Sequence, residues 1–351
     1  MFGKHRRKRY REKIARGLRA AHASAPVEDV VLDELKLIVF SDHHRGTGDR
    51  ADDFRKCRRL YHAALGYYDS LRYRLFLLGD VEEMWERILF TILATYRPTL
   101  DLEQRFFERG EAERFVGNHD ENLGRAWNYN QIRGFIADRP LLETLRLRVR
   151  EKPDDDPETS ALGELFFAHG HQGVKYHWYH RFAVRRIWAF WQLLTGVGPG
   201  VPSRDLKIRL THERAMYEWA TQEQEDLLLI CGHTHNPVFM STAWQETVRA
   251  EVEELSRKED ASADEIAVAM ARLRWAEAAA QESKTALPDG AKPCYFNAGC
   301  CSFHDGDLTG IEISEGRIRL VHWSGEKGLP ERNVLREADL QRVFSKCCDC
   351  D

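Results

Sequence analysis

Five short apolar segments of this chain are each followed at once by polar residues, and this pattern constrains the fold more than any other feature. The segments are residues 35–40, 75–78, 114–116, 164–168 and 226–231. Their length and composition predict strands, while residues 51–72 have the apolar spacing of a helix. Alternating strands and helices predict an α/β fold whose polar clusters lie on loops at the strand ends, where such sheets place their active sites.

The pattern changes toward the C-terminus. Residues 294–298, 310–314 and 318–323 read as strands that follow one another closely, and Glu315 with Gly316 reads as a hairpin turn. These segments predict a second, more antiparallel sheet.

The polar clusters contain residue types that bind metal ions. The candidate ligands are Asp42, His44, Asp80, Asn118, His169, His233 and His235. Asp-x-His and His-x-His spacing puts two donors on one face of an extended segment, because side chains alternate there. A single such histidine is more often structural, but five clusters together favour a metal centre. Mixed carboxylate, imidazole and amide donors favour Mn, Fe or Zn over calcium.

These clusters, in this order, resemble the signature of calcineurin-like metallophosphoesterases. The resemblance runs from about residue 35 to residue 323. It implies a four-layer αββα sandwich with helical insertions and a site for two divalent ions, with Mn as the first choice. It assigns one ion to Asp42, His44 and His235, the other to Asn118, His169 and His233, and the bridging position to Asp80. The activity implied is hydrolysis of a phosphate ester or pyrophosphate through in-line attack of a metal-bridging hydroxide.

Three further residues are candidates for catalysis. His119 directly follows Asn118, so we expect it to act as the general acid that protonates the departing oxygen. We expect Asp120 to orient His119, as carboxylates commonly do for imidazoles. Arg45 either binds a phosphate oxygen or pairs with a neighbouring Asp. His43 and His171 are not needed as ligands, and we expect them to support the ligands or to be structural.

The predicted domain organisation has three parts. Residues 1–34 form a basic N-terminal arm, residues 35–335 the metallophosphoesterase domain, and residues 336–351 a Cys-containing tail. Residues 174–220 are rich in aromatic and basic side chains and form an insertion. Residues 245–283 lack Gly and Pro, and predict a charged helical hairpin as a second insertion.

The arm and the first insertion each have competing interpretations. Residues 4–19 carry nine Lys or Arg residues against the single acid Glu12, which is typical of a solvated, partly disordered arm. The alternative is a helix that lies on anionic lipid or phosphate. Residues 174–220 are a buried helical pair, a lid over the substrate, or a membrane-surface helix.

The eight cysteines predict a reduced protein. Apolar neighbours predict buried free thiols at Cys57, Cys231, Cys294, Cys300 and Cys301. The tail thiols Cys347, Cys348 and Cys350 lack a second ligand pair at zinc-site spacing, which predicts a frayed, reduced tail.

The substrate class remains open at this stage. Residues 79–86, 232–237 and 297–299 are similar to the branch that contains UDP-2,3-diacylglucosamine hydrolases, so a lipid A pyrophosphatase is one alternative. That branch has arginine where this chain has His119. Two further alternatives are a nuclease-type phosphodiesterase and a non-catalytic scaffold with the same fold.

Charge and hydropathy limit the classes of partner and the cellular location that we expect. A net charge of −4 makes nucleic acid an unfavoured partner, so we expect a phosphorylated small molecule or a lipid-linked substrate. No apolar run reaches the roughly 20 residues of a membrane-spanning helix, and the N-terminus lacks a secretory apolar segment. We expect a cytoplasmic protein, with contact to the inner face of a membrane through residues 1–25 or 174–194 as an open alternative.

Overall fold

The computed structural model describes the chain at residues 4–152, 161–174, 206–223, 226–243, 292–303, 305–325 and 328–348, with a few positions between 249 and 273. Most of the two predicted insertions therefore lies outside the described residues, as do residues 1–3 and 349–351. The described part is a mixed α/β structure, as the sequence predicts, with two mixed sheets. None of its helices has the length and apolar character required to cross a membrane.

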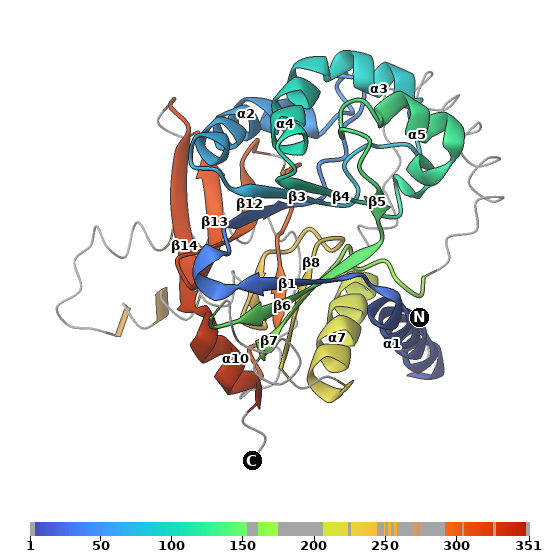
Figure 1. Cartoon of the computed structure of the whole chain (residues 1–351). Coiled ribbons are helices and arrows are strands. Elements are labelled where there is room, and N and C mark those ends of the chain that lie inside the picture. Colours follow the sequence, from blue (N-terminus) through green and yellow to red (C-terminus); the bar gives the residue numbers. More distant parts are fainter. Residues whose placement is uncertain are drawn as a thin grey trace.

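Each sheet has seven strands (Figure 1). The first has the order β1 (Val27–Val31), β6 (Thr144–Arg150), β7 (Ala161–Ala168), β8 (Leu227–Cys231), β11 (Tyr295–Asn297), β9 (Val238–Phe239) and β10 (Thr242–Ala243). The second has the order β14 (Glu331–Asp339), β13 (Arg317–Ser324), β12 (Leu308–Ser314), β2 (Leu37–Phe40), β3 (Arg74–Leu78), β4 (Ala112–Phe115) and β5 (Leu141–Leu142).

Helices cover the outer faces of both sheets (Figure 1). The second sheet carries α2 (Phe54–Ser70), α3 (Leu89–Thr95), α4 (Arg97–Glu108) and α5 (Ala126–Ile132). On the far side of the first sheet lie α1 (Lys4–Ser24), α7 (Leu206–Glu223) and α10 (Leu340–Cys348). Two short 3-10 helices, η1 (Leu32–Glu34) and η2 (Glu121–Gly124), lie in connections.

Strand β2 shows why these residues form buried strands. Its side chains alternate between two cores, with Leu37 and Val39 in the core shared by the two sheets. Ile38 and Phe40 face the core that the second sheet shares with its helices. A strand buried on both faces has no polar alternation, which is why it reads as a continuous apolar run.

The predicted second sheet is present, but the C-terminal strands do not form it by themselves. β11 pairs in parallel with β8 in the first sheet. β12 instead pairs antiparallel with β2, with Ile311 opposite Val39, so β12 and β13 extend the second sheet. Apolar patterning reveals a strand but does not specify its partner strand. The predicted hairpin turn is confirmed, with Glu315 and Gly316 both at positive φ.

The five strands that precede the polar clusters belong to both sheets. β2, β3 and β4 are parallel neighbours in the second sheet, and β7 and β8 are parallel neighbours in the first. Parallel strands present their carboxyl ends at one edge of a sheet. The candidate ligands are therefore delivered to a common edge from two sheets.

The prediction of a partly disordered N-terminal arm is wrong for the described residues. Residues 4–24 form α1, and Ile14, Leu18 and Ala21 are buried in the core against the first sheet and α7. Arg11 pairs with Glu218 of α7 at 2.7 Å. The three apolar positions share one helix face, and the dense positive charge around them hid this spacing in the sequence.

Helix α1 should therefore contribute to stability. Leu18→Ala is expected to lower the free energy of unfolding by about 2–5 kcal/mol, because it leaves a cavity in a closed core. Arg16→Ala, on the exposed face of the same helix, should change it by less than about 0.5 kcal/mol. Urea unfolding followed by circular dichroism measures both. Equal stability of the two variants would mean that α1 is a solvated arm that does not pack into the core.

The prediction of a frayed C-terminal tail is also wrong for the residues described. The domain boundary at residue 335 falls inside β14, and α10 follows it. Leu340, Val343, Phe344 and Cys347 of α10 are buried in the core. The predicted buried free thiols at Cys57, Cys231, Cys294, Cys300 and Cys301 are confirmed, and Cys347 is a sixth.

Candidate metal centre

Backbone hydrogen bonds join the loops that follow β2 and β3. The amide of Asp42 donates to the carbonyl of Gly79 (3.2 Å), that of His44 to Asp80 (3.0 Å), and that of Arg45 to Val81 (2.8 Å). This continues the parallel pairing of the two strands beyond their ends. Asp42 and Asp80 are thereby held side by side.

The candidate ligands have an unusual backbone conformation. Twelve non-glycine residues of the described chain have positive φ, and five of them are Asp42, His44, Asp80, His233 and His235. Side chains disfavour this region, and such residues cluster at functional sites. The surrounding loops must therefore impose this conformation on the ligands.

Two glycines let the ligand loops approach one another. A Cβ on Gly79 would lie 2.7 Å from Nδ1 of His169, and one on Gly117 would collide with the carboxylate of Asp80. Glycine is thus required before Asp80 and before Asn118, since a larger residue would displace the side chain of His169 or of Asp80.

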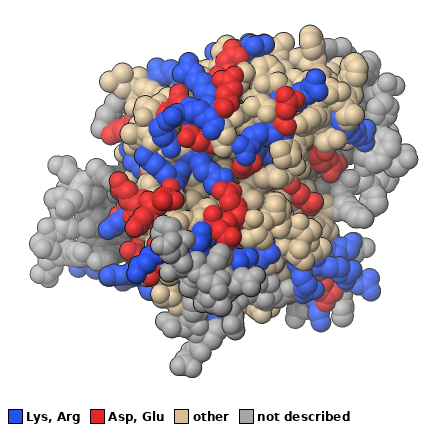
Figure 2. All heavy atoms as spheres, in the orientation of Figure 1, with Lys and Arg blue, Asp and Glu red and all other residues tan. Residues whose placement is uncertain are grey.

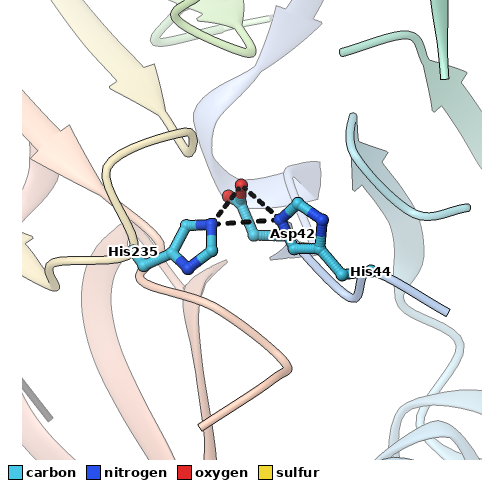
Figure 3. A group of neighbouring side chains, drawn as sticks. All are labelled: Asp42, His44 and His235. Atoms are coloured by element: carbon cyan, nitrogen blue, oxygen red, sulfur yellow. Dashed lines mark hydrogen bonds and ion pairs between the residues drawn. The ribbon is translucent and has the colours of Figure 1, made fainter. Parts of the chain in front are cut away.

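One group of donors consists of Asp42, His44 and His235 (Figure 3). Oδ1 of Asp42 lies 3.2 Å from Nε2 of His235 and 3.7 Å from Nε2 of His44. The two imidazole nitrogens are 3.1 Å apart. Three donor atoms from two separate loops therefore converge on one point.

A second group consists of Asp80, His169 and His233. Oδ2 of Asp80 lies 3.2 Å from Nε2 of His169 and 3.9 Å from Nε2 of His44. Asp80 is thus within reach of both groups. Asn118, the remaining candidate ligand, is also buried. It lies close to Asp80, because the backbone amide of the next residue, His119, donates to Oδ1 of Asp80 at 2.7 Å.

Oδ1 of Asn118 is buried without a hydrogen-bond partner. Oδ1 of Asp42 and Nε2 of His169 are also buried and lack a well-aligned hydrogen bond, although each lies 3.2 Å from a side chain of opposite charge. Unsatisfied buried polar atoms are rare in folded proteins and call for an explanation, such as a bound ion. A carboxylate, an amide oxygen and an imidazole nitrogen form a donor set that suits transition-metal ions. These residues could therefore hold metal ions.

The electrostatics of the groups point the same way. Burial alone would raise the pKa of Asp42 and Asp80, but the neighbouring histidines hold both well below their usual range. Burial would lower the pKa of His169, but Asp80 and Asp42 raise it to about 9. Both carboxylates therefore stay ionised although they are buried, and the ionised form is the one that binds a cation.

Hydrogen bonds to Nδ1 of the candidate histidine ligands fix the orientation of their rings. Nδ1 of His169 donates to the carbonyl of Leu78 (2.8 Å), which turns Nε2 toward Asp80. Nδ1 of His44 contacts Glu83 (3.1 Å), which turns its Nε2 toward Asp42. Such partners commonly set the tautomer and ring orientation of metal-binding histidines.

His119 lies beside this centre, but its partner is not the predicted one. Its Nδ1 contacts Oε2 of Glu83 at 2.6 Å, while its Nε2 lies 3.9 Å from Oδ2 of Asp80. The ring of Trp85 stacks on it, with centroids 3.6 Å apart and planes 13° apart. Trp85 also donates from Nε1 to the carbonyl of Asn118 (2.6 Å).

The prediction that Asp120 orients His119 is therefore wrong. Asp120 is fully buried and accepts hydrogen bonds from the amides of Gly117 (2.6 Å) and Val81 (2.9 Å) and from Arg114 (2.7 Å). Its side chain points away from the neighbouring imidazole. It instead joins the loop that carries Asn118 to the loop that carries Asp80.

Arg45 does not serve as a phosphate ligand in this arrangement, so its assignment as a catalytic residue is corrected. Its guanidinium is 1% exposed and pairs with Glu82 (2.7 Å) and Glu103 (3.0 Å). Arg114 pairs with the other oxygen of Glu82. The predicted alternative, pairing with a neighbouring carboxylate, holds, although the partners are Glu and not Asp.

His43 and His171 both lie near the loops of the candidate ligands. The ring of His43 is buried against Tyr61, with centroids 4.7 Å apart, and burial holds its pKa well below the usual range. The ring of His171 lies 5.4 Å from that of His169, and burial lowers its pKa to about 3. Both rings are therefore neutral spacers beside the ligand loops.

Three residues near the centre have no role in the sequence-based prediction. Glu83 and Trp85 lie just after Asp80, so their closeness to a ligand was a usable signal. His212 of α7 comes from a distant segment without any motif. Its ring lies 4.7 Å from that of His233, its Nε2 donates to the carbonyl of Gly170 (2.5 Å), and burial lowers its pKa to about 4.

No protein-family model matches the chain, and no curated protein matches it either. What the site does must therefore be inferred from its own residues.

Proposed function

We propose that the protein is a calcineurin-like metallophosphoesterase that hydrolyses a phosphate ester or a pyrophosphate with two divalent metal ions. The observation that carries the proposal is the position of Asp80. Its carboxylate reaches one donor group through His169 and the other through His44, as a bridging ligand must. The stacked sheets with helices on their outer faces support the four-layer sandwich that the sequence resemblance implies.

Each ion has a defined set of residues in this proposal. Asp42, His44 and His235 hold one, Asn118, His169 and His233 hold the other, and Asp80 is shared. When bound, two divalent ions would lower the pKa of a water molecule and neutralise phosphoryl oxygens during in-line attack. Mn is our first choice for reconstitution, and Fe or Zn are alternatives with the same donor preference.

The residues around the ions have their own tasks. Glu83 accepts from Nδ1 of His119, so the proton on Nε2 faces the centre and can pass to the departing oxygen. Trp85 covers one face of that imidazole and excludes water from it. Asp120 holds the loop of Asp80 against the loop of Asn118. The retained ligands and the His119–Glu83 pair argue against a non-catalytic scaffold.

A substrate panel tests the proposal. We expect the Mn-loaded protein to hydrolyse an aryl phosphate or an aryl phosphodiester, and the panel should add nucleotide sugars, cyclic nucleotides, oligonucleotides and lipid phosphates. Protein stripped of metal and reloaded with Mg²⁺, Zn²⁺ or Fe²⁺ serves for comparison. No turnover of any substrate at confirmed metal occupancy would refute the activity.

Glu83→Gln tests how His119 is positioned. Gln is isosteric but lacks the charge that holds two imidazoles, so kcat should fall by roughly 10- to 100-fold. The fall should be larger for phenyl phosphate than for nitrophenyl phosphate, because the poorer leaving group needs the acid more. Glu86→Gln, on an exposed neighbour, is the control and should leave kcat unchanged. Equal losses on the two substrates would mean that Glu83 does not act through His119.

A further inference from the structure

Helix α1 presents one strongly basic face to solvent. Lys8, Arg9, Lys13 and Arg16 are exposed there, and Glu12 is the one acid among the exposed side chains from residue 8 to residue 20. Figure 2 shows Lys and Arg side chains gathered at the lower right, where Figure 1 places α1. The opposite face is pinned into the core by Ile14 and Leu18, so the charges are held on a rigid scaffold.

Helix α1 adjoins the metal centre from the side of the first sheet, through residues on the face opposite these charges. The backbone of Gly173, four residues after His169, lies directly against Gly17 of α1. The hydroxyl of Tyr10 contacts Nδ1 of His212 at 3.0 Å, and the ring of His212 lies 4.7 Å from that of His233. One intervening side chain therefore separates α1 from a candidate metal ligand.

Exposed apolar side chains flank the centre from the side of the second sheet. Among the described residues, four large hydrophobic side chains are more than two-thirds exposed, and three of these are Ile88 (70%), Phe90 (69%) and Trp127 (80%). Ile88 and Phe90 follow closely on Trp85, which stacks on His119, and Trp127 is the second residue of α5, the helix after the His119 loop. α3 and α5 contact one another.

We propose that the edge carrying the metal centre docks on an anionic phospholipid surface, through the basic face of α1 and the apolar side chains Ile88, Phe90 and Trp127. Cations beside exposed Trp and Phe are the composition that binds membrane interfaces, where headgroups meet the charges and acyl boundaries meet the rings. A nucleic acid would match the cations of α1 but would leave the aliphatic Ile88 in water.

Docking in this orientation would bring phosphate esters of the membrane to the metal centre. The proposal goes beyond hydrolysis and does not require it, because binding is measured without turnover. Its failure would leave the proposed activity untouched, and an inactive protein could still dock.

Vesicle flotation of the full-length protein tests the proposal. We expect binding to vesicles of phosphatidylcholine with about one-third phosphatidylglycerol, much weaker binding to pure phosphatidylcholine, and a fall in binding from about 0.05 M to about 0.5 M salt. The triple variant K8E/K13E/R16E should bind on the order of a hundredfold more weakly. The control R336E/R342E/K346E reverses three exposed cations on β14 and α10 and should bind like the unmodified protein.

A second pair of variants measures how much the exposed apolar side chains contribute to vesicle binding. F90A/W127A should weaken binding at least about tenfold, and more visibly at high salt, because charge attraction is screened there. L329A removes another side chain that is 76% exposed, two residues before β14, and should have no effect. Circular dichroism confirms that each variant is folded.

Three results would overturn the proposal. Equal binding to charged and neutral vesicles, or full binding by the α1 triple variant, would remove the basic face from the interaction. Tighter binding to an oligonucleotide than to vesicles, with the same dependence on α1, would assign that face to nucleic acid. Dimerisation in light scattering that F90A/W127A abolishes would assign the apolar side chains to a second copy of the chain.

Discussion

Replacing Asp80 with Asn is expected to lower kcat for an aryl phosphate by at least about 1,000-fold, because loss of an outer partner of a metal ligand alone costs roughly 10- to 100-fold. Asp80 is the one carboxylate within reach of both donor groups among the residues described. An amide keeps the shape and the hydrogen bond from the amide of His119 but lacks the charge needed between two cations.

The variant should remain folded, since the substitution removes no volume from the core. Metal content after Mn reconstitution should fall below that of the unmodified protein, and steady-state kinetics measures the loss. Asp33→Asn, on an exposed residue of η1, controls for the chemistry of the substitution and should retain full activity. Retention of more than about one-tenth of the activity in Asp80→Asn would contradict a bridging role.

Arg45→Met is expected to destabilise the protein by about 3–5 kcal/mol, because it leaves buried carboxylates without their cation. Glu82 is fully buried and Glu103 is 3% exposed, and both contact this guanidinium. Burial alone would lower the pKa of Arg45, but these two carboxylates raise it, so the side chain stays charged. The network continues to Arg114 and Asp120, which clamp the ligand loops.

Thermal and urea unfolding measure this loss. Arg58→Met, on an exposed position of α2, is the matched control and should change stability by less than about 0.5 kcal/mol. If Arg45 were a phosphate ligand instead, the variant would keep its stability and show a raised KM. Such a result would reverse the structural role assigned to Arg45.

The convergence of the candidate ligands could be predicted, because their clusters follow apolar strands and parallel strands deliver their ends to one edge. Asp42 and Asp80 come from neighbouring strands and meet there, joined by backbone hydrogen bonds. The assignment of strands to two sheets could not be predicted in the same way, because the patterning around Ile311 carries no information about its partner Val39.

The supporting contacts were harder to predict, since neighbours in sequence can point in opposite directions. Asp120 follows His119 but turns inward to Arg114, while Glu83, 36 residues away, holds the imidazole. His212 carries no motif because its position depends on how α7 packs. In α1, nine basic residues hid the apolar face formed by Ile14 and Leu18.

The most direct test of the dinuclear centre is an anomalous difference map at the manganese absorption edge, from crystals of the full chain grown with Mn²⁺. Such a centre should give two peaks about 3.5–4 Å apart, as in other two-metal sites. One should lie among Asp42, His44 and His235, the other among Asn118, His169 and His233, with Asp80 between them. No peak at these residues, or a single peak that leaves one group vacant at saturating metal, would contradict the dinuclear centre.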